Sequence, residues 1–170
     1  MTSFLLQMAG DPGSGKSTLA RALGESTGAL ILDKDIIKSA ALTAGAEESV
    51  AAPLAYEALF GLARSILDQG RSVILDSPAY FMRIRDTGRE IAKAQGIPYH
   101  IIECVAGREL VAARLASRER LRSQLDQPVI DPYARPGAAP LEEPRCTIDM
   151  PGPLDECVRQ ALEYMGHDAR

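Results

Sequence analysis

Short apolar runs alternate with longer stretches of helical periodicity along the chain. The apolar runs span residues 3–9, 29–33, 71–76 and 99–105, and residues 146–149 form a shorter candidate. Apolar runs separated by helical segments are typical of βα units, which build a parallel sheet covered by helices. The pattern therefore predicts an α/β fold.

Helical periodicity fills the intervals between these runs. We expect helices over residues 16–26, 35–43, 53–69 and 109–122, and a further helix that ends near residues 95–96. A final amphipathic helix has an apolar face at helical spacing, formed by Leu154, Val158, Leu162 and Met165. Prolines recur between residues 128 and 144 and exclude a single regular element, so we expect a flap there.

Length and composition favour one cytoplasmic domain over residues 1–170. Lys and Arg number 19 against 23 Asp and Glu, and this balance gives no general attraction for nucleic acid or anionic membranes. Three widely spaced cysteines indicate reduced thiols rather than a disulfide framework. We also expect no membrane helix, because that needs about 18 apolar residues in a row. The oligomeric state stays open.

The strongest motif directly follows the first apolar run. Residues 10–17 read Gly-Asp-Pro-Gly-Ser-Gly-Lys-Ser, which matches the phosphate-binding pattern G-x-x-x-x-G-K-[ST]. Glycines let the backbone fold around phosphate oxygens, and the N-terminus of the following helix adds partial positive charge. In such a loop the lysine reaches the β- and γ-phosphates and the serine hydroxyl binds Mg²⁺. The expected phosphate-binding residues are Gly10, Asp11, Pro12, Gly13, Ser14, Gly15, Lys16, Ser17 and Thr18.

Carboxylates follow two of the predicted strands. Asp33 and Asp35 come after the second strand, and Asp76 ends the third. Ligands of an open α/β sheet bind beyond the carboxyl ends of its strands. Phosphoryl transfer needs a carboxylate to accept the proton of the attacking hydroxyl and another near Mg²⁺. We assign Asp35 to the first role and Asp76, with Ser17, to the second. Helix capping is the alternative for Asp35, and Asp33 also stays open.

Two arginines lie one helical turn apart after the fourth strand. Arg114 and Arg118 share one face of the helix predicted there, next to the proline-rich flap. In a kinase, such arginines can neutralise charge on the transferring phosphoryl group. A solvated face paired with glutamates is the alternative. Arg83 and Arg85 follow the third strand and are weaker candidates for substrate contact.

These motifs together resemble a known group of enzymes. The chain is similar to small P-loop kinases of the group that includes chloramphenicol phosphotransferase, zeta toxins and the kinase domain of polynucleotide kinase. The resemblance rests on residues 10–18, 35–38 and 72–76 and on the pair Arg114 and Arg118. It implies a three-layer α/β/α P-loop NTPase fold, with a five-stranded parallel sheet around the first strand and a lid near residues 114–144. Asp11 departs from the pattern, and we expect its side chain to point to solvent.

The function expected from the sequence is an ATP- and Mg²⁺-dependent kinase that acts on a hydroxyl group of a small molecule. Lys16 and the loop amides bind the phosphates, Asp35 activates the acceptor, and Arg118 and Arg114 stabilise the transferring group. GTP as the donor is left open. Two alternatives are a nucleic-acid end kinase, disfavoured by few aromatic residues, and a nucleotide-dependent switch that hydrolyses ATP slowly.

Overall fold

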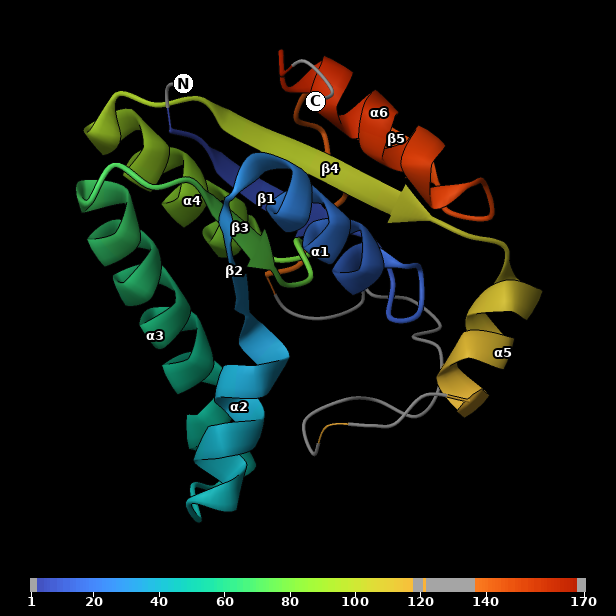
Figure 1. Cartoon of the computed structure of the whole chain (residues 1–170). Helices are drawn as coiled ribbons and strands as arrows, with labels where there is room; N and C mark the ends of the chain where they lie inside the picture. The colour runs from blue at the N-terminus through green and yellow to red at the C-terminus, as the bar shows by residue number, and fades with distance from the viewer. Residues whose placement is uncertain (1–2, 118–120, 122–136, 168–170) are drawn as a thin grey trace.

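A central parallel sheet organises the computed structural model, which describes residues 3–117, 121 and 137–167 (Figure 1). Its strands run in the order β2-β3-β1-β4-β5, and each neighbouring pair is parallel. The strands are β1 (Leu5–Ala9), β2 (Leu30–Asp33), β3 (Val73–Asp76), β4 (Tyr99–Val105) and β5 (Cys146–Asp149). The five-stranded parallel sheet with the first strand at its centre is thus confirmed.

Helices follow the strands as the periodicity predicts, with one clear difference in bounds. They are α1 (Lys16–Thr27), α2 (Lys34–Thr43), α3 (Glu48–Asp68), α4 (Met82–Gln95), α5 (Arg108–Ser117) and α6 (Leu154–Tyr164). The prediction started the third helix at residue 53, but α3 begins at Glu48 and contains Pro53. Proline removes one backbone donor there, and the buried face of the helix continues through it because Ala51 and Ala55 are both buried.

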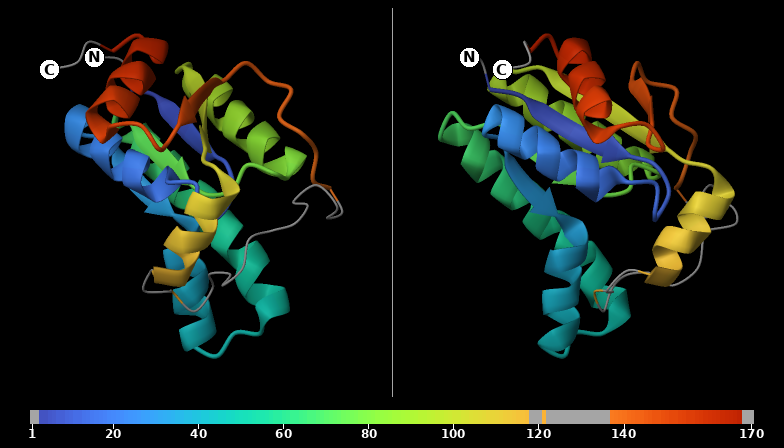
Figure 2. Two further views of the ribbon diagram at one scale, coloured as in Figure 1. Left: turned by 90° about the vertical axis from the view of Figure 1, so that its right-hand side faces the viewer. Right: turned by 45° about the vertical axis from the view of Figure 1, so that its right-hand side comes forward.

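Alternate residues of β1 face two different cores, which makes the fold three-layered. Leu6 and Met8 pack in a cluster that includes residues of α1 and α6. Leu5 packs in a second cluster with residues of α3 and α4. Figure 2 shows α1 and α6 together on one side of the sheet, with α3 and α4 on the other. Every residue of β1 is therefore buried, and its carboxyl end delivers the phosphate-binding motif to the middle of the sheet edge.

The helix α3 is long and apolar enough, by length and composition alone, to cross a membrane. The sequence analysis expected no such segment. In the fold, one face of α3 packs against the sheet through Leu59, Phe60 and Ala63, while its other face is exposed at Val50, Leu54 and Leu62. Packing against the sheet therefore accounts for its apolar inner face.

Candidate functional site

The phosphate-binding motif forms a tight turn between β1 and α1. Gly10, Gly13 and Gly15 have φ angles of 119°, 82° and 107°, which L-residues with side chains rarely adopt. A Cβ atom on Gly10 would lie 2.1 Å from the carbonyl oxygen of Cys104, so that position has no room for one. The loop therefore has the backbone shape that phosphate binding needs, at the N-terminus of a helix.

Lys16 folds back onto the loop that contains it. Its Nζ donates hydrogen bonds to the carbonyl oxygens of Gly10 and Asp11, at 2.9 and 2.8 Å. Burial lowers the pKa of the ammonium group, and the nearby carboxylates of Asp76, Asp11 and Asp35 oppose that shift. The structure thus places the lysine within the electrostatic reach of all three carboxylates.

Asp76 and Ser17 lie in direct contact, as their expected shared role requires. The Ser17 hydroxyl is hydrogen bonded to the Asp76 carboxylate, which is almost fully buried at the end of β3. Burial raises the pKa of Asp76, the hydrogen bond from Ser17 lowers it, and the negative charge of Asp33 raises it again. Asp33 is the register partner of Asp76 on the neighbouring strand.

Asp33, rather than Asp35, caps the helix that follows β2. The Oδ1 atom of Asp33 accepts hydrogen bonds from the backbone amides of Asp35 and Ile36, at 2.7 and 3.4 Å. This is the usual geometry of an aspartate N-cap. The capping alternative that the sequence left open for Asp35 is therefore wrong, and the Asp35 carboxylate instead forms an ion pair with Lys34.

Two lysines accompany Asp35 on α2. Lys34 forms an ion pair with the Asp35 carboxylate, and its Nζ lies 6.0 Å from the centre of the Tyr56 ring. Lys38, three residues after Asp35, pairs with Glu48 at the start of α3. Lys34, rather than Lys38, is therefore the lysine that contacts Asp35, and the sequence did not predict this contact.

Arg114 contacts the phosphate loop, as its place in the predicted site requires. Its guanidinium group donates to the carbonyl oxygens of Ser14 and Met150, at 3.3 and 3.4 Å. The residues Val111 and Leu115 of the same helix lie against Gly13 of the loop. Arg118, the other arginine of the predicted pair, lies outside the described residues, so its role stays a prediction.

Arg85 is a structural residue rather than a substrate contact. Its side chain is almost fully buried and donates to the carbonyl oxygens of Ala79 and Ala139, at 2.8 and 3.0 Å, and to Glu143 at 2.8 Å. It therefore fastens residues 139–143 to the loop between β3 and α4. Arg83, the neighbouring candidate, forms an exposed ion pair with Glu57.

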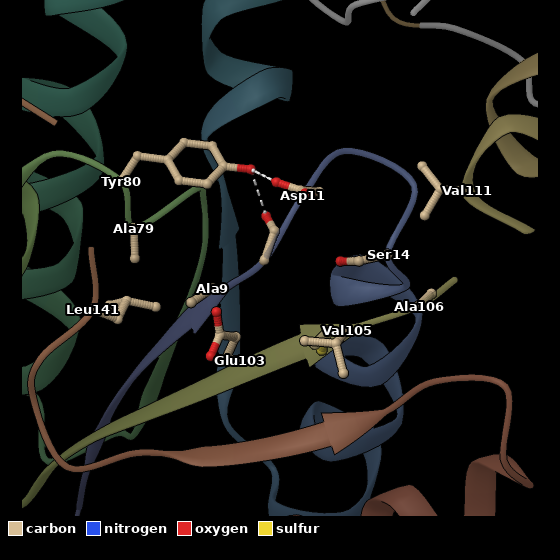
Figure 3. Close-up of a pocket in the computed structure, with 12 residues that line it drawn as sticks. Ala9, Asp11, Ser14, Ala79, Tyr80, Glu103, Val105, Ala106, Val111 and Leu141 are labelled. Atoms are coloured by element: carbon tan, nitrogen blue, oxygen red, sulfur yellow. Dashed lines mark hydrogen bonds between the residues drawn. The ribbon is translucent and has the colours of Figure 1, made fainter. Parts of the chain in front are cut away.

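Tyr80 is a contact of the phosphate loop that sequence analysis missed. Its hydroxyl group lies 2.7 Å from Oδ1 of Asp11 and 3.1 Å from the carbonyl oxygen of Gly10 (Figure 3). Asp11 is an exposed residue, but its carboxylate accepts a hydrogen bond from a buried tyrosine. Asp11 is thus exposed to solvent, as expected, but one of its carboxylate oxygens also contacts Tyr80. An acidic side chain inside the phosphate-binding motif was the available signal.

The described part of the expected lid is fixed at both ends. Residues 114–117 belong to α5, next to the phosphate loop. At the other end, two backbone hydrogen bonds join the segment to the β3–α4 connection. The amide of Ala139 donates to the carbonyl oxygen of Tyr80 at 2.9 Å, and the amide of Met82 donates to the carbonyl oxygen of Gly137 at 3.2 Å. The same connection thus joins the C-terminal end of this segment to the phosphate loop.

The donor set fits Mg²⁺ held jointly with a nucleotide. Among residues 3–117, 121 and 137–167, no group of three His, Cys, Asp or Glu side chains could hold a metal alone. Mg²⁺ commonly binds through one or two protein oxygens together with substrate phosphates and water. The adjacent oxygens of Ser17 and Asp76 match that chemistry.

Curated relatives extend well beyond the region that this chain matches. Uncharacterized proteins of Mycobacterium tuberculosis and Mycobacterium bovis are 28% identical to it over an alignment of 129 residues, and the match covers 69% of this chain. The chain matches only 26% of the length of these relatives.

Solved structures with the same fold include three kinases. The APS kinase of Mycobacterium tuberculosis, solved with AMPPNP and APS, has a TM-score of 0.73 at 19% identity over 97% of this chain and 98% of that one. A sugar kinase of a Janibacter species has a TM-score of 0.67 at 21% identity, over 98% of this chain and 95% of that one. A gluconokinase of Sinorhizobium meliloti has a TM-score of 0.59 at 21% identity, over 97% of this chain and 91% of that one.

The family model described as "AAA domain" matches residues 5–135, which include the phosphate loop and Asp35, Asp76 and Arg114. Nucleotide binding follows from this match together with the loop geometry. The chain belongs to the AAA domain family and has the fold of small P-loop kinases.

Proposed function

We propose that this chain is an ATP- and Mg²⁺-dependent phosphotransferase that moves the γ-phosphate of ATP to a hydroxyl group of a small molecule. The observation that carries the proposal is the position of Asp35. Its carboxylate lies close enough to Lys16 and Asp76 to influence the pKa of both, while Asp33 caps the helix. A carboxylate held beyond the phosphates, without a capping role, suits a general base.

In this proposal the phosphate loop and Lys16 bind the phosphates of ATP. The loop amides and the start of α1 bind the phosphates, and Lys16 exchanges its hydrogen bonds with Gly10 and Asp11 for phosphate oxygens. Ser17 and Asp76 would hold Mg²⁺, which when bound supplies electrostatic stabilisation of the phosphate charge.

The acceptor side falls to Asp35. Its carboxylate takes the proton of the acceptor hydroxyl as that oxygen bonds to the γ-phosphorus, while the bond from phosphorus to the β–γ bridging oxygen breaks. ADP leaves with the charge of the bridging oxygen, and the phosphate ester forms on the acceptor. Lys34 forms an ion pair with the carboxylate and so orients it before the acceptor arrives. Arg114, at the loop, and Arg118 neutralise charge on the transferring group.

A screen of hydroxyl compounds tests the proposal. Purified protein with ATP and Mg²⁺ would be incubated with sets of sugars, nucleosides, amino alcohols and hydroxylated antibiotics. ADP formation and the product mass would then be measured. We expect ADP formation that depends on one set, with one phosphoryl group added to a member of that set.

Two outcomes would contradict this proposal. Phosphorylation of a 5′-hydroxyl oligonucleotide alone would instead identify a nucleic-acid end kinase. ATP hydrolysis to inorganic phosphate at the same rate with every set would indicate a nucleotide-dependent switch.

A further inference from the structure

A pocket lies beside the phosphate loop, away from the proposed catalytic cluster of Lys16, Ser17, Asp35 and Asp76. Its volume is about 260 Å³, and it opens between the ends of β1 and β4, the β3–α4 loop and Leu141 (Figure 3). Lys16, Ser17, Asp35 and Asp76 do not line it. Pockets for drug-sized ligands typically measure about 300–1,000 Å³, so this one suits a smaller molecule.

Apolar side chains form most of the pocket wall. Ala79 and Leu141 line one side, and Val105 and Val111 the other, as Figure 3 shows. The apolar residue Ala9, at the end of β1, lies between these sides. An occupant therefore needs an apolar body.

The polar side chains of the wall are the carboxylates of Glu103 and Asp11 and the hydroxyl groups of Tyr80 and Ser14. Glu103 uses Oε2 to accept from Arg145 at 2.7 Å, and none of the hydrogen bonds within the described structure uses its Oε1. Asp11 accepts from Tyr80 through Oδ1. The Ser14 hydroxyl is buried without a hydrogen-bond partner, and Figure 3 shows its oxygen directed towards the pocket.

No Lys, Arg or His side chain of residues 3–117, 121 and 137–167 lines this pocket. Arg145, behind the wall, compensates part of the charge of Glu103, but the wall itself presents two carboxylates and no cation, which makes it unfavourable for phosphates and other anions. The same charges favour a protonated amine, which donates hydrogen bonds and pairs with carboxylates. An unpartnered buried hydroxyl at the same wall would gain a hydrogen-bond partner.

We propose that this pocket is a second ligand site, which binds a small primary amine with an apolar body through the carboxylates of Glu103 and Asp11. The site goes beyond the proposed phosphotransfer, because the catalytic carboxylates do not line it. Since Asp11 belongs to the phosphate loop, the ammonium group of the ligand contacts the loop from outside the catalytic cluster.

Benzylamine, benzyl alcohol and benzoate test the site, because they share one apolar ring and differ in charge. Isothermal titration calorimetry at pH 7 would measure the dissociation constant of each with the whole chain. We expect benzylamine to bind about tenfold more tightly than benzyl alcohol, as one charge-assisted hydrogen bond provides. Benzoate should bind more weakly than either. Equal affinity of benzylamine and benzoate would overturn the proposal.

Three variants locate the binding and test its charge preference. Val105→Trp adds a large ring at a half-exposed position of the wall and should abolish benzylamine binding. Val50→Trp makes the same change on the exposed face of α3 and should leave binding as in the wild type. Glu103→Gln keeps the shape of the side chain and should remove the preference for benzylamine over benzyl alcohol. Thermal melting verifies that each variant is folded. Unchanged benzylamine binding by folded Val105→Trp would refute the site.

Discussion

The ammonium group of Lys16 donates a hydrogen bond to the carbonyl oxygen of Gly10 over a distance of 2.9 Å. The lysine is buried, and burial lowers its pKa, so its charge is costly to the folded chain by itself. Phosphate oxygens would be stronger partners for this charge than backbone carbonyls. We therefore expect the lysine to serve ligand binding at the expense of stability.

Replacing this lysine should separate binding from stability. Lys16→Met should weaken ATP binding by about 10- to 100-fold, the effect of losing a charge-assisted contact. Its melting temperature without nucleotide should equal or exceed that of the wild type. Lys93→Met, at an exposed position of α4, is the matched control and should change neither property. An ATP affinity of Lys16→Met equal to that of the wild type would refute the role of the lysine.

At Asp76, too, we expect ligand binding and stability to oppose each other, and the effect on stability should depend on pH. Its pKa in the folded chain is raised from 3.8, mainly by burial, so above that pH the folded state retains the proton more strongly than the unfolded state. The free energy of unfolding therefore falls as pH rises through this interval. Asp76→Asn lacks the buried charge and should melt at a higher temperature than the wild type at pH 7, with a smaller difference at pH 4.

The same substitution should impair the metal-dependent step. Asp76→Asn should lose most of the increase in ATP affinity that Mg²⁺ gives the wild type, measured by titration with and without the ion. A variant that is less stable at pH 7 and still fully responsive to Mg²⁺ would contradict both parts of the argument.

A buried and a partly buried tyrosine provide a matched test of the contact between the phosphate loop and Tyr80. The Tyr80 hydroxyl is bonded to the loop, whereas the buried Tyr99 hydroxyl has no hydrogen-bond partner in the described structure. Tyr80→Phe should lower the free energy of unfolding by about 1 kcal/mol and change the KM for ATP. Tyr99→Phe should be neutral or stabilising, because it removes an unsatisfied group. Equal effects on urea denaturation would show that the Tyr80 contact contributes nothing specific.

Arg83 and Arg85, two positions apart on α4, test how the C-terminal end of the lid segment is held. Arg85→Met removes a buried charge from four backbone carbonyls and Glu143, and should lower the free energy of unfolding by about 3–5 kcal/mol. Arg83→Met removes only an exposed ion pair and should cost less than about 1 kcal/mol. Chemical denaturation measures both, and an Arg85→Met variant as stable as Arg83→Met would rule out the anchoring role.

The features that the sequence predicted well depend on local patterns. The α/β class with a parallel sheet followed from the alternation of apolar runs and helices, and the phosphate loop from residues within one eight-residue motif. The central place of the first strand was implied by the resemblance to small P-loop kinases. The expected helix start at residue 53 was wrong because proline is a strong boundary signal in sequence, while burial of the alanines around it maintains α3.

The features that the sequence missed depend on contacts between distant segments. Asp11 and Tyr80 are 69 positions apart, and Arg85 and Glu143 are 58 apart, so no local spacing links them. The roles of Asp33 and Asp35 were ambiguous because both lie at the junction of β2 and α2. Only the backbone geometry, with Oδ1 of Asp33 at 2.7 Å from the Asp35 amide, distinguishes the capping residue from the candidate base.

The central claim is that Asp35 accepts the proton of an acceptor hydroxyl. The most direct measurement compares Asp35→Asn with the wild type in transfer of labelled γ-phosphate to the acceptor found in the screen. ATP affinity is measured in parallel. Our account predicts a rate lower by about 10²- to 10⁴-fold with ATP affinity close to that of the wild type. Phosphate transfer by Asp35→Asn at the wild-type rate would contradict it.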